Sequence, residues 1–451
     1  MADEKGLDTL LGEPRAAIRS MVIPFLISIA TVQINVFADT FWVSGLGVDA
    51  VSGMTSAIPL YSVFSNIAVG LSVGAVSTIA FRLGKGDRSS ASRLAGSAIS
   101  TGIVMAALCS TIVFVLLDPV VDVMGAQDVR KEIFEYVLPI ILLSPAVVLN
   151  TIFGGLLRAE GNARRSTVVQ MSAAIINMAL DPVLIYGAGL GIAGAGLATA
   201  LSSCFGVAIA VRWYMNGKTA VAVGREDLKP DLETEKEIMT VAGPRTLEGL
   251  TMSVVILFQR VFIIMAGGTV GVALFNVPFR YVNLSMCPCE ATGMAMVPVA
   301  SAAYGQGNLN KMRTSMVYAL KLVMSMSFVL SLALFVLSEP LISLLTTEPS
   351  MEEWKDAFVW NMMMYSIIPP FFALQTIGSS MLQSMKRSKR PMEVTMLLGI
   401  IRMFLFWICS SYDYRAITIA LIFSYVLSST LMMILARYEF KKIERQISQG
   451  T

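Results

Sequence analysis

Two aspartates lie inside long apolar stretches of the sequence, and each is preceded by an asparagine four residues earlier. Asp39 follows Asn35, and Asp181 follows Asn177. Residues four apart face the same side of a helix, so each pair presents an amide and a carboxylate together. A buried carboxylate needs a compensating partner, and these oxygens suit a small hard cation or a proton shared between two acids. The two pairs therefore indicate a site for a small cation or a proton.

Neighbouring apolar stretches add further oxygen ligands. Thr199 and Ser202 share a helix face, and Tyr136 lies in a different stretch at a comparable depth. The alternative interpretation is structural, with each aspartate protonated and hydrogen-bonded so that it only fixes helix packing. Two acids at one depth, each with its own asparagine, favour the ion site.

The second half of the chain carries basic residues within its apolar stretches. When the halves are aligned, a glutamine stands opposite Asp39 and a phenylalanine opposite Asp181. One interpretation is that the arginines pair internally with carbonyls, amides or acids; the other is that they meet an anionic part of a substrate. The polar cluster of this half consists of Gln259, Arg260, Arg280, Glu290 and Arg402.

Only membrane-spanning helices can position these residues. Of the 451 residues, 55% are hydrophobic and 14% charged, with a mean hydropathy of +0.70. Soluble domains contain about 25% charged residues, so the composition predicts an all-α membrane protein without a soluble catalytic domain. Histidine is absent, which excludes imidazole bases and His-ligated metal or haem sites. No cofactor is expected apart from Na⁺ or H⁺ as the coupling ion.

Basic residues recur in every second connector, and this pattern predicts the topology. Residues 20–81 contain no Lys or Arg, whereas four basic residues follow between 82 and 93. Because short basic loops stay in the cytoplasm, both termini are expected there, in a multi-pass protein of the cell membrane. Asp39 and Asp181 fall in one layer, roughly 22–24 Å from the cytoplasmic edge. The predicted spans are 16–44, 48–81, 90–117, 129–157, 164–187, 191–215, 238–266, 270–303, 310–338, 351–385, 391–411 and 414–438.

The two halves of the sequence repeat one another. L-G-K-G-D at 83–87 matches Y-G-Q-G-N at 304–308, and the basic segment 155–165 matches 380–390. Each half has an even number of spans, so the repeats are parallel, about an axis along the membrane normal. We therefore predict twelve transmembrane helices in two pseudo-symmetric six-helix lobes around a central cleft. The predicted lobes are residues 1–215 and 238–451, joined by a cytoplasmic linker at 216–237.

These features resemble the multidrug and toxic compound extrusion (MATE) family, in particular its DNA-damage-inducible-F-like branch. The resemblance rests on Asp39 in the first span, on Asn177 and Asp181 before a proline in the fifth, on R-A-E-G-N-A-R at 158–164 and on the G-x-G loops after the second and eighth spans. It covers nearly the whole chain. The family implies antiport, in which entering sodium ions or protons drive the export of amphipathic, often cationic, drugs or toxic metabolites.

The resemblance also assigns roles to individual residues. The second half lacks the carboxylates that another branch of the family carries there, so the implied cation site lies in the first lobe alone. The resemblance implies that Tyr136 lies beside this site, and the helix-face spacing predicts that Asn35 and Ser202 are also beside it or in contact with substrate. The residues that correspond to the cation site, with sodium as a candidate ion, are Asp39, Asn177, Asp181 and Thr199.

Two other functions compete with antiport. A flippase for lipids or lipid-linked oligosaccharides would share the lobed fold, and the arginines of the second half favour it. A membrane-embedded transferase or hydrolase needs paired acids at the water interface, but the nearest match, D-P-V-V-D at 118–122, is a short outer connector. We therefore expect no enzyme. The expected partners are the lipid bilayer and small amphipathic substrates, with no nucleic acid, and the protein is expected to be monomeric.

Overall fold

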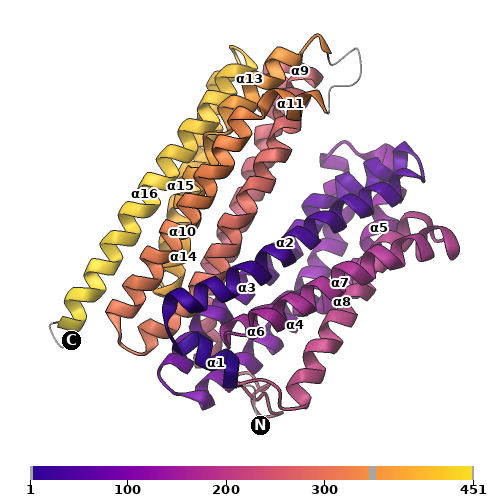
Figure 1. Ribbon diagram of the computed structural model, residues 1–451. Coiled ribbons are helices and arrows are strands. Elements are labelled where there is room, and N and C mark those ends of the chain that lie inside the picture. Colours follow the sequence, from indigo (N-terminus) through magenta and orange to yellow (C-terminus); the bar gives the residue numbers. More distant parts are fainter. Residues whose placement is uncertain (1–3, 345–351, 449–451) are drawn as a thin grey trace. The chain divides into compact units, whose positions relative to one another are not determined.

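The computed structural model describes residues 4–344 and 352–448, apart from the side chains of Glu4, Thr269, Ile447 and Ser448, and these residues form helices and connecting loops with no β-strand (Figure 1). The elements are α1 (Glu4–Leu11), α2 (Pro14–Ser44), α3 (Val48–Gly84), α4 (Arg88–Val123), η1 (Gln127–Val129), α5 (Arg130–Leu142), α6 (Ser144–Ala159), α7 (Ala163–Pro182), η2 (Val183–Gly187), α8 (Gly191–Met215), α9 (Leu232–Gly305), α10 (Leu309–Val336), α11 (Ser338–Ser343), α13 (Lys355–Tyr365), α14 (Ile368–Ser384), α15 (Lys389–Cys409) and α16 (Tyr414–Ser448).

Within the described ranges, ten segments are long and apolar enough to cross a membrane, and the bent pair α5–α6 makes an eleventh. The helix α9 supplies two of the predicted spans. Its 74 residues would extend about 110 Å if straight, far more than the roughly 30 Å of a bilayer core. The break is Gly268, with φ 60° and ψ −150°, a conformation open essentially to glycine alone. The arm after Gly268 corresponds to the predicted span 270–303, and this completes the predicted set of twelve.

Two predicted spans are not straight. The span predicted at 129–157 bends by 60° between α5 and α6, and Pro145 lies in the first turn of α6. The span predicted at 351–385 is divided into α13 and α14, with prolines at the start of α14; residue 351 lies outside the described residues. Proline lacks the backbone N–H and disfavours a helical residue before it, so both breaks occur where a helix restarts.

The chain forms two compact units. Unit 1 comprises the residues up to Leu247 together with Ser301–Asn308, and unit 2 comprises Glu248–Ala300 and the residues from Leu309 onward. The predicted division into lobes 1–215 and 238–451 around a linker at 216–237 stays a prediction. Residues 1–3 and 449–451, at the ends of the predicted lobes, lie outside the described residues.

Small residues set the helix packing of unit 1. A Cβ added to Gly155 of α6 would lie 2.2 Å from the hydroxyl of Ser72 on α3, and one on Gly196 of α8 would lie 2.1 Å from the carbonyl oxygen of Tyr136 on α5. Lipid supplies no hydrophobic drive between helices, so close approach through small residues is the usual source of packing. The helices that carry the polar residues are thereby held at short range.

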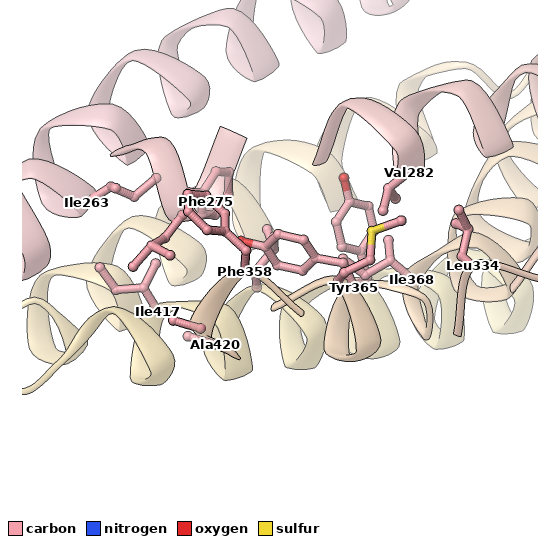
Figure 2. Close-up of a cluster of buried hydrophobic side chains, with 14 of the residues drawn as sticks. Ile263, Phe275, Val282, Leu334, Phe358, Tyr365, Ile368, Ile417 and Ala420 are labelled. Carbon is pink, nitrogen blue, oxygen red and sulfur yellow. The ribbon is translucent and has the colours of Figure 1, made fainter. Parts of the chain in front are cut away.

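Unit 2 has a core of aromatic and aliphatic side chains. Phe275, Val282, Phe358 and Tyr365 are buried in one cluster, which extends along α9, α13, α14 and α16 (Figure 2). Neighbouring rings meet in the edge-to-face geometry that aromatic pairs favour, as between Phe275 and Tyr365 at 5.5 Å. One face of the second arm of α9 is fixed by this cluster.

Candidate functional site

The polar site of unit 1 is assembled by helix pairs that are distant in sequence. α2 packs on α7, α7 packs on α8, and α8 packs on α5. These contacts bring Asp39 and Asn35 of α2 together with Asn177 and Asp181 of α7. Asp181 is fully buried and Asn177 is 3% exposed, whereas the two α2 residues are half-buried.

Two asparagines connect the three helices. The amide of Asn35 donates to both carboxyl oxygens of Asp39 at 3.3 Å. The side-chain amide of Asn177 is oriented so that both its nitrogen and its oxygen find partners. Its nitrogen donates to Oδ1 of Asp39 at 3.0 Å and to Oδ1 of Asn35 at 2.9 Å, and its oxygen accepts from the backbone N–H of Thr199 at 3.1 Å. Amide orientation follows from such a network. Asn177 therefore ties α7 to both α2 and α8.

The carboxyls of Asp39 and Asp181 face one another at hydrogen-bonding range. Oδ2 of Asp181 is buried and has no hydrogen-bond donor among the described residues. Two ionised carboxylates are acceptors only, so neither satisfies the other, and their charges repel in a low dielectric. The geometry becomes favourable when a proton or a small cation lies between them.

Hydroxyl groups surround this acid pair. The hydroxyl of Tyr136 is hydrogen-bonded to Thr199 and lies within electrostatic range of both acids. Thr199 and Ser202 also donate to the backbone of their own helix, to Ala195 and Thr199 respectively. Thr199 thus lies at the site, while the Ser202 hydroxyl is engaged by the turn that carries it.

Sequence reasoning missed Tyr61 of α3. It lies within electrostatic range of Asp39 and of Tyr136, so the acid pair has a tyrosine from each of two helices. A tyrosine inside an apolar span has no distinctive spacing. The sequence feature that could have identified Tyr61 is its position two residues after Pro59, a proline that lies within the helix.

The end of α2 packs against the turn after α7 and the start of α8. Val43, Ile185 and Ile192 form a small core against Trp42 and Tyr136, and the hydroxyl of Tyr186 donates to the carbonyl of Trp42. The turn η2, which follows Pro182, is π-helical, a form that is rare and often found at functional sites. The segments that follow Asp39 and Asp181 are thus held together by packed side chains.

The structure separates the polar residues predicted in unit 2. Arg402 of α15 is 6% exposed and lies over the ring of Tyr425 at 4.9 Å. Arg260 and Arg280, on the two arms of α9, are exposed, and Gln259 is half-buried. Glu290 is exposed and lies about 33 Å along the helix from Gly268, compared with about 18 Å for Arg280. These five residues are therefore not one cluster.

Unit 2 does not reproduce the acid pair. Its buried amide, Asn361, donates to the carbonyl of Leu274 at 3.0 Å and accepts from Thr418 at 2.8 Å, so it joins α13 to α9 and α16. Within residues 4–344 and 352–448, no three His, Cys, Asp or Glu side chains are grouped to hold a metal ion. An ion at the acid pair would therefore depend on amide and hydroxyl oxygens as well as carboxylates.

Comparison with known proteins gives one consistent result. The family model described as MatE matches residues 24–183 and 244–408. The FAD transporter of Shewanella oneidensis is 25% identical over 350 residues, which are 75% of this chain and 76% of that protein. The multidrug export protein MepA of Staphylococcus aureus is 23% identical over 355 residues, 78% of this chain and 77% of its own.

A solved structure extends the similarity to nearly the full chain. It is a MOP superfamily transporter from Pyrococcus furiosus, described as having a binding pocket of reverse polarity that suggests a different function. The two chains are 25% identical with a TM-score of 0.92, and the match covers 98% of this chain and 99% of the other. The predicted membrane fold is confirmed at this level.

Proposed function

Because the chain belongs to the MatE family of membrane transporters, we propose that it is an antiporter that exports amphipathic compounds in exchange for sodium ions or protons. Members of this family are transporters and not enzymes. The coupling ion, the exchange mechanism and the substrate are the parts that we propose.

One observation carries the proposal: the carboxyls of Asp39 and Asp181 lie at hydrogen-bonding range from each other, and Oδ2 of Asp181 has no donor among the described residues. The structural alternative, a proton held permanently between the acids, would satisfy both. An ion site differs from it because the proton or cation must leave in each cycle. The asparagines and hydroxyls around the acids are oxygen ligands of the kind that a hard cation uses.

Coupling follows from linkage between the ion and the substrate. An empty acid pair is a site of uncompensated negative charge, and ion binding removes the repulsion between the carboxylates of α2 and α7. If the conformation that binds the ion binds substrate weakly, substrate weakens ion binding by the same factor. A membrane potential of 100 mV contributes about 2.3 kcal/mol per charge moved, which supports roughly fiftyfold accumulation of a neutral compound per ion.

The names of the relatives leave a wide choice of substrate. One is a FAD transporter and another exports multiple drugs, so the similarity extends to a flavin nucleotide carrier as well as to a drug exporter. We propose an amphipathic organic compound as the substrate of this chain. The acids that would attract a cationic compound are engaged by the coupling ion in this scheme, so the charge preference depends on unit 2.

Transport by purified protein in proteoliposomes tests the proposal. Ethidium, riboflavin and riboflavin phosphate serve as fluorescent probes, and sodium and pH gradients are imposed separately. We expect one gradient to drive movement of at least one probe. Asp39→Asn should abolish this movement, whereas Asp49→Asn, which removes an exposed acid at the start of α3, should not. Full gradient-driven activity of Asp39→Asn would refute the assignment.

The multi-pass membrane character is clear from the family and the apolar helices. We further propose that both termini are cytoplasmic in a cell membrane, because the basic residues gather in the connectors on that side. Reporter fusions after residues in the loops at 83–87 and 124–129 test this orientation. The first should report the cytoplasm and the second the opposite side.

A further inference from the structure

The second arm of α9, from Gly268 to Gly305, has a polar stripe on its exposed face. Asn276, Arg280 and Asn283 are all exposed, and their spacing of four and three residues places them on one side of a helix. We call these three residues the α9 stripe. Phe275 and Val282, each one position before a stripe asparagine and so about 100° round the helix from it, point into the aromatic cluster of the unit 2 core (Figure 2).

This stripe is out of place on a surface that contacts lipid. Exposed positions elsewhere on the unit 2 helices carry large apolar residues, such as Ile264, Phe328 and Ile400, as expected for contact with hydrocarbon. An arginine in the bilayer centre costs about 2.5–3.5 kcal/mol on insertion scales, and such residues face cavities or partners. Because of this cost, we infer that the α9 stripe faces water, beside the exposed Leu284.

The stripe has positive charge that the protein does not neutralise. Within the described residues, the guanidinium of Arg280 has no ion-pair partner, and neither has that of Arg260 on the first arm. Arg260 lies about 12 Å and Arg280 about 18 Å along the helix from Gly268, so they share a layer. The unit 2 acids of α9, Glu248 and Glu290, lie roughly 30 Å from that residue.

We propose that the α9 stripe binds the anionic group, a phosphate or a carboxylate, of the transported amphipathic compound. Arg280 would hold the anion through its planar fork of N–H donors, which matches phosphate and carboxylate oxygens. The amides of Asn276 and Asn283 lie one turn to either side of it and add donors. This inference rests on the proposed export function and names its substrate class.

Arg280 and Arg402 differ in whether their guanidinium groups are available to a ligand. Arg402 is buried against the ring of Tyr425, so its charge is already engaged within unit 2. Arg280 is exposed and its guanidinium is free of any carboxylate in the described ranges. Only an available guanidinium can select a ligand by its charge.

Binding of a matched pair of flavins to the full-length protein tests the site. Riboflavin and riboflavin phosphate differ only by the phosphate, and their fluorescence reports binding in detergent without any gradient. We expect wild-type protein to prefer the phosphate, and Arg280→Gln to weaken its binding about ten- to hundredfold. Riboflavin binding should be unchanged. Arg280→Lys, which keeps the charge but lacks the fork, should fall between the two.

The control variant is Lys321→Gln, which removes an exposed cation from α10 of the same unit and should bind both flavins like the wild type. Thermal unfolding of Arg280→Gln should match the wild type because the side chain is exposed. Equal binding of the two flavins by wild-type protein, or unchanged phosphate preference in Arg280→Gln, would overturn the proposal.

Two further measurements make two distinctions. One distinguishes a lipid headgroup from a soluble compound as the source of the anion, and the other distinguishes failure of the antiport function from failure of the anion site. Movement of a fluorescent phosphatidylserine that depends on Arg280 would support the same site with a lipid headgroup as its ligand, whereas export of riboflavin phosphate would support a soluble ligand. If no gradient drives any probe but phosphate binding still depends on Arg280, the antiport function fails and the anion site stands. If gradients drive export with no preference for the phosphate, the antiport function stands and the anion site fails.

Discussion

The two units carry opposite charges inside their spanning helices. In unit 1 the deep charged residues are Asp39 and Asp181, and the carboxyl of Asp39 accepts hydrogen bonds from the amides of Asn35 and Asn177. In unit 2 they are arginines, one buried on a tyrosine ring and two exposed on the arms of α9. Repeats of similar sequence have therefore acquired different chemistry.

The burial of each charged group, and not the sign of its charge, determines the size of the ligand that it can bind. Asp181 is fully buried and Asp39 is half-buried, so a small ion is the natural species to satisfy the acid pair. The exposed arginines are open to water, so they can meet a larger molecule. Each of the following changes tests one side of this contrast.

The largest effect is expected at the enclosed acid. Asp181→Asn removes a charged ligand worth about 3 kcal/mol, so gradient-driven efflux should fall about a hundredfold. Flavin phosphate binding in detergent should persist, because the α9 stripe is intact. Initial rates in proteoliposomes and equilibrium binding measure the two quantities. Loss of both efflux and flavin phosphate binding would mean that ion coupling and substrate binding are not separated between unit 1 and unit 2.

A second buried acid of unit 1 predicts a pH-dependent stability. Glu160, between α6 and α7, is 2% exposed, and burial raises its pKa from 4.5 to about 7, although hydrogen bonds from Ala220 and Tyr214 oppose the shift. Below pH 4.5 the carboxyl is protonated in both states, so this group then costs no stability. As the pH rises towards 7 the unfolded state ionises first, and folding loses about 3 kcal/mol.

Glu160→Gln should remove that slope. Thermal unfolding in detergent at pH 5 and pH 8 measures it, and the variant should lose less stability than the wild type on going to the higher pH. Identical slopes for the two proteins would contradict the pKa assignment.

The buried arginine of unit 2 should matter for stability and not for selectivity. Arg402→Gln removes the cation from the ring of Tyr425, which costs about 2 kcal/mol for a desolvated pair. Melting temperature and the preference between riboflavin and its phosphate are the two measurements. Tyr425→Phe, which keeps an aromatic ring, is the milder control. A change in preference at unaltered stability would place Arg402 in the substrate path instead.

The smallest effect is expected at Glu439 of unit 2. This acid is buried, but it is paired with the half-exposed Arg387 at 3.6 Å and Arg390 at 3.3 Å. Solvent screens partners that are 43% and 45% exposed, so Glu439→Gln should cost about 1 kcal/mol. The same unfolding experiment as for Glu160 measures the cost. A loss above that of Arg402→Gln would show that pairing in unit 2 is stronger than its exposure suggests.

The membrane spans and the shared depth of the two aspartates were predictable from short stretches of the sequence. Hydropathy and the basic connectors predict the spans because each depends only on a short stretch of sequence. Depth along the helices predicts that Asp39 and Asp181 share a layer, and the structure brings them together. That an ion binds between them stays a prediction.

Tertiary packing determined what the sequence could not show. Tyr61 reaches Asp39 through the position of α3, which no spacing encodes. Arg260, Arg280 and Arg402 all lie within apolar stretches of the sequence, yet of these three only Arg402 lies over an aromatic ring in the described structure. The bend between α5 and α6 was missed because proline is compatible with a continuous span when neighbouring helices compensate.

The junction at Gly268 makes the register of α9 sensitive to chain length. One residue inserted after it would rotate the whole second arm by about 100° relative to its packing partners. Phe275 and Val282 would leave the aromatic core and Arg280 would turn toward it, so a single codon would cost both the stability of unit 2 and its positive face. Insertions should therefore be tolerated in the loop at 217–230 and rejected at this glycine.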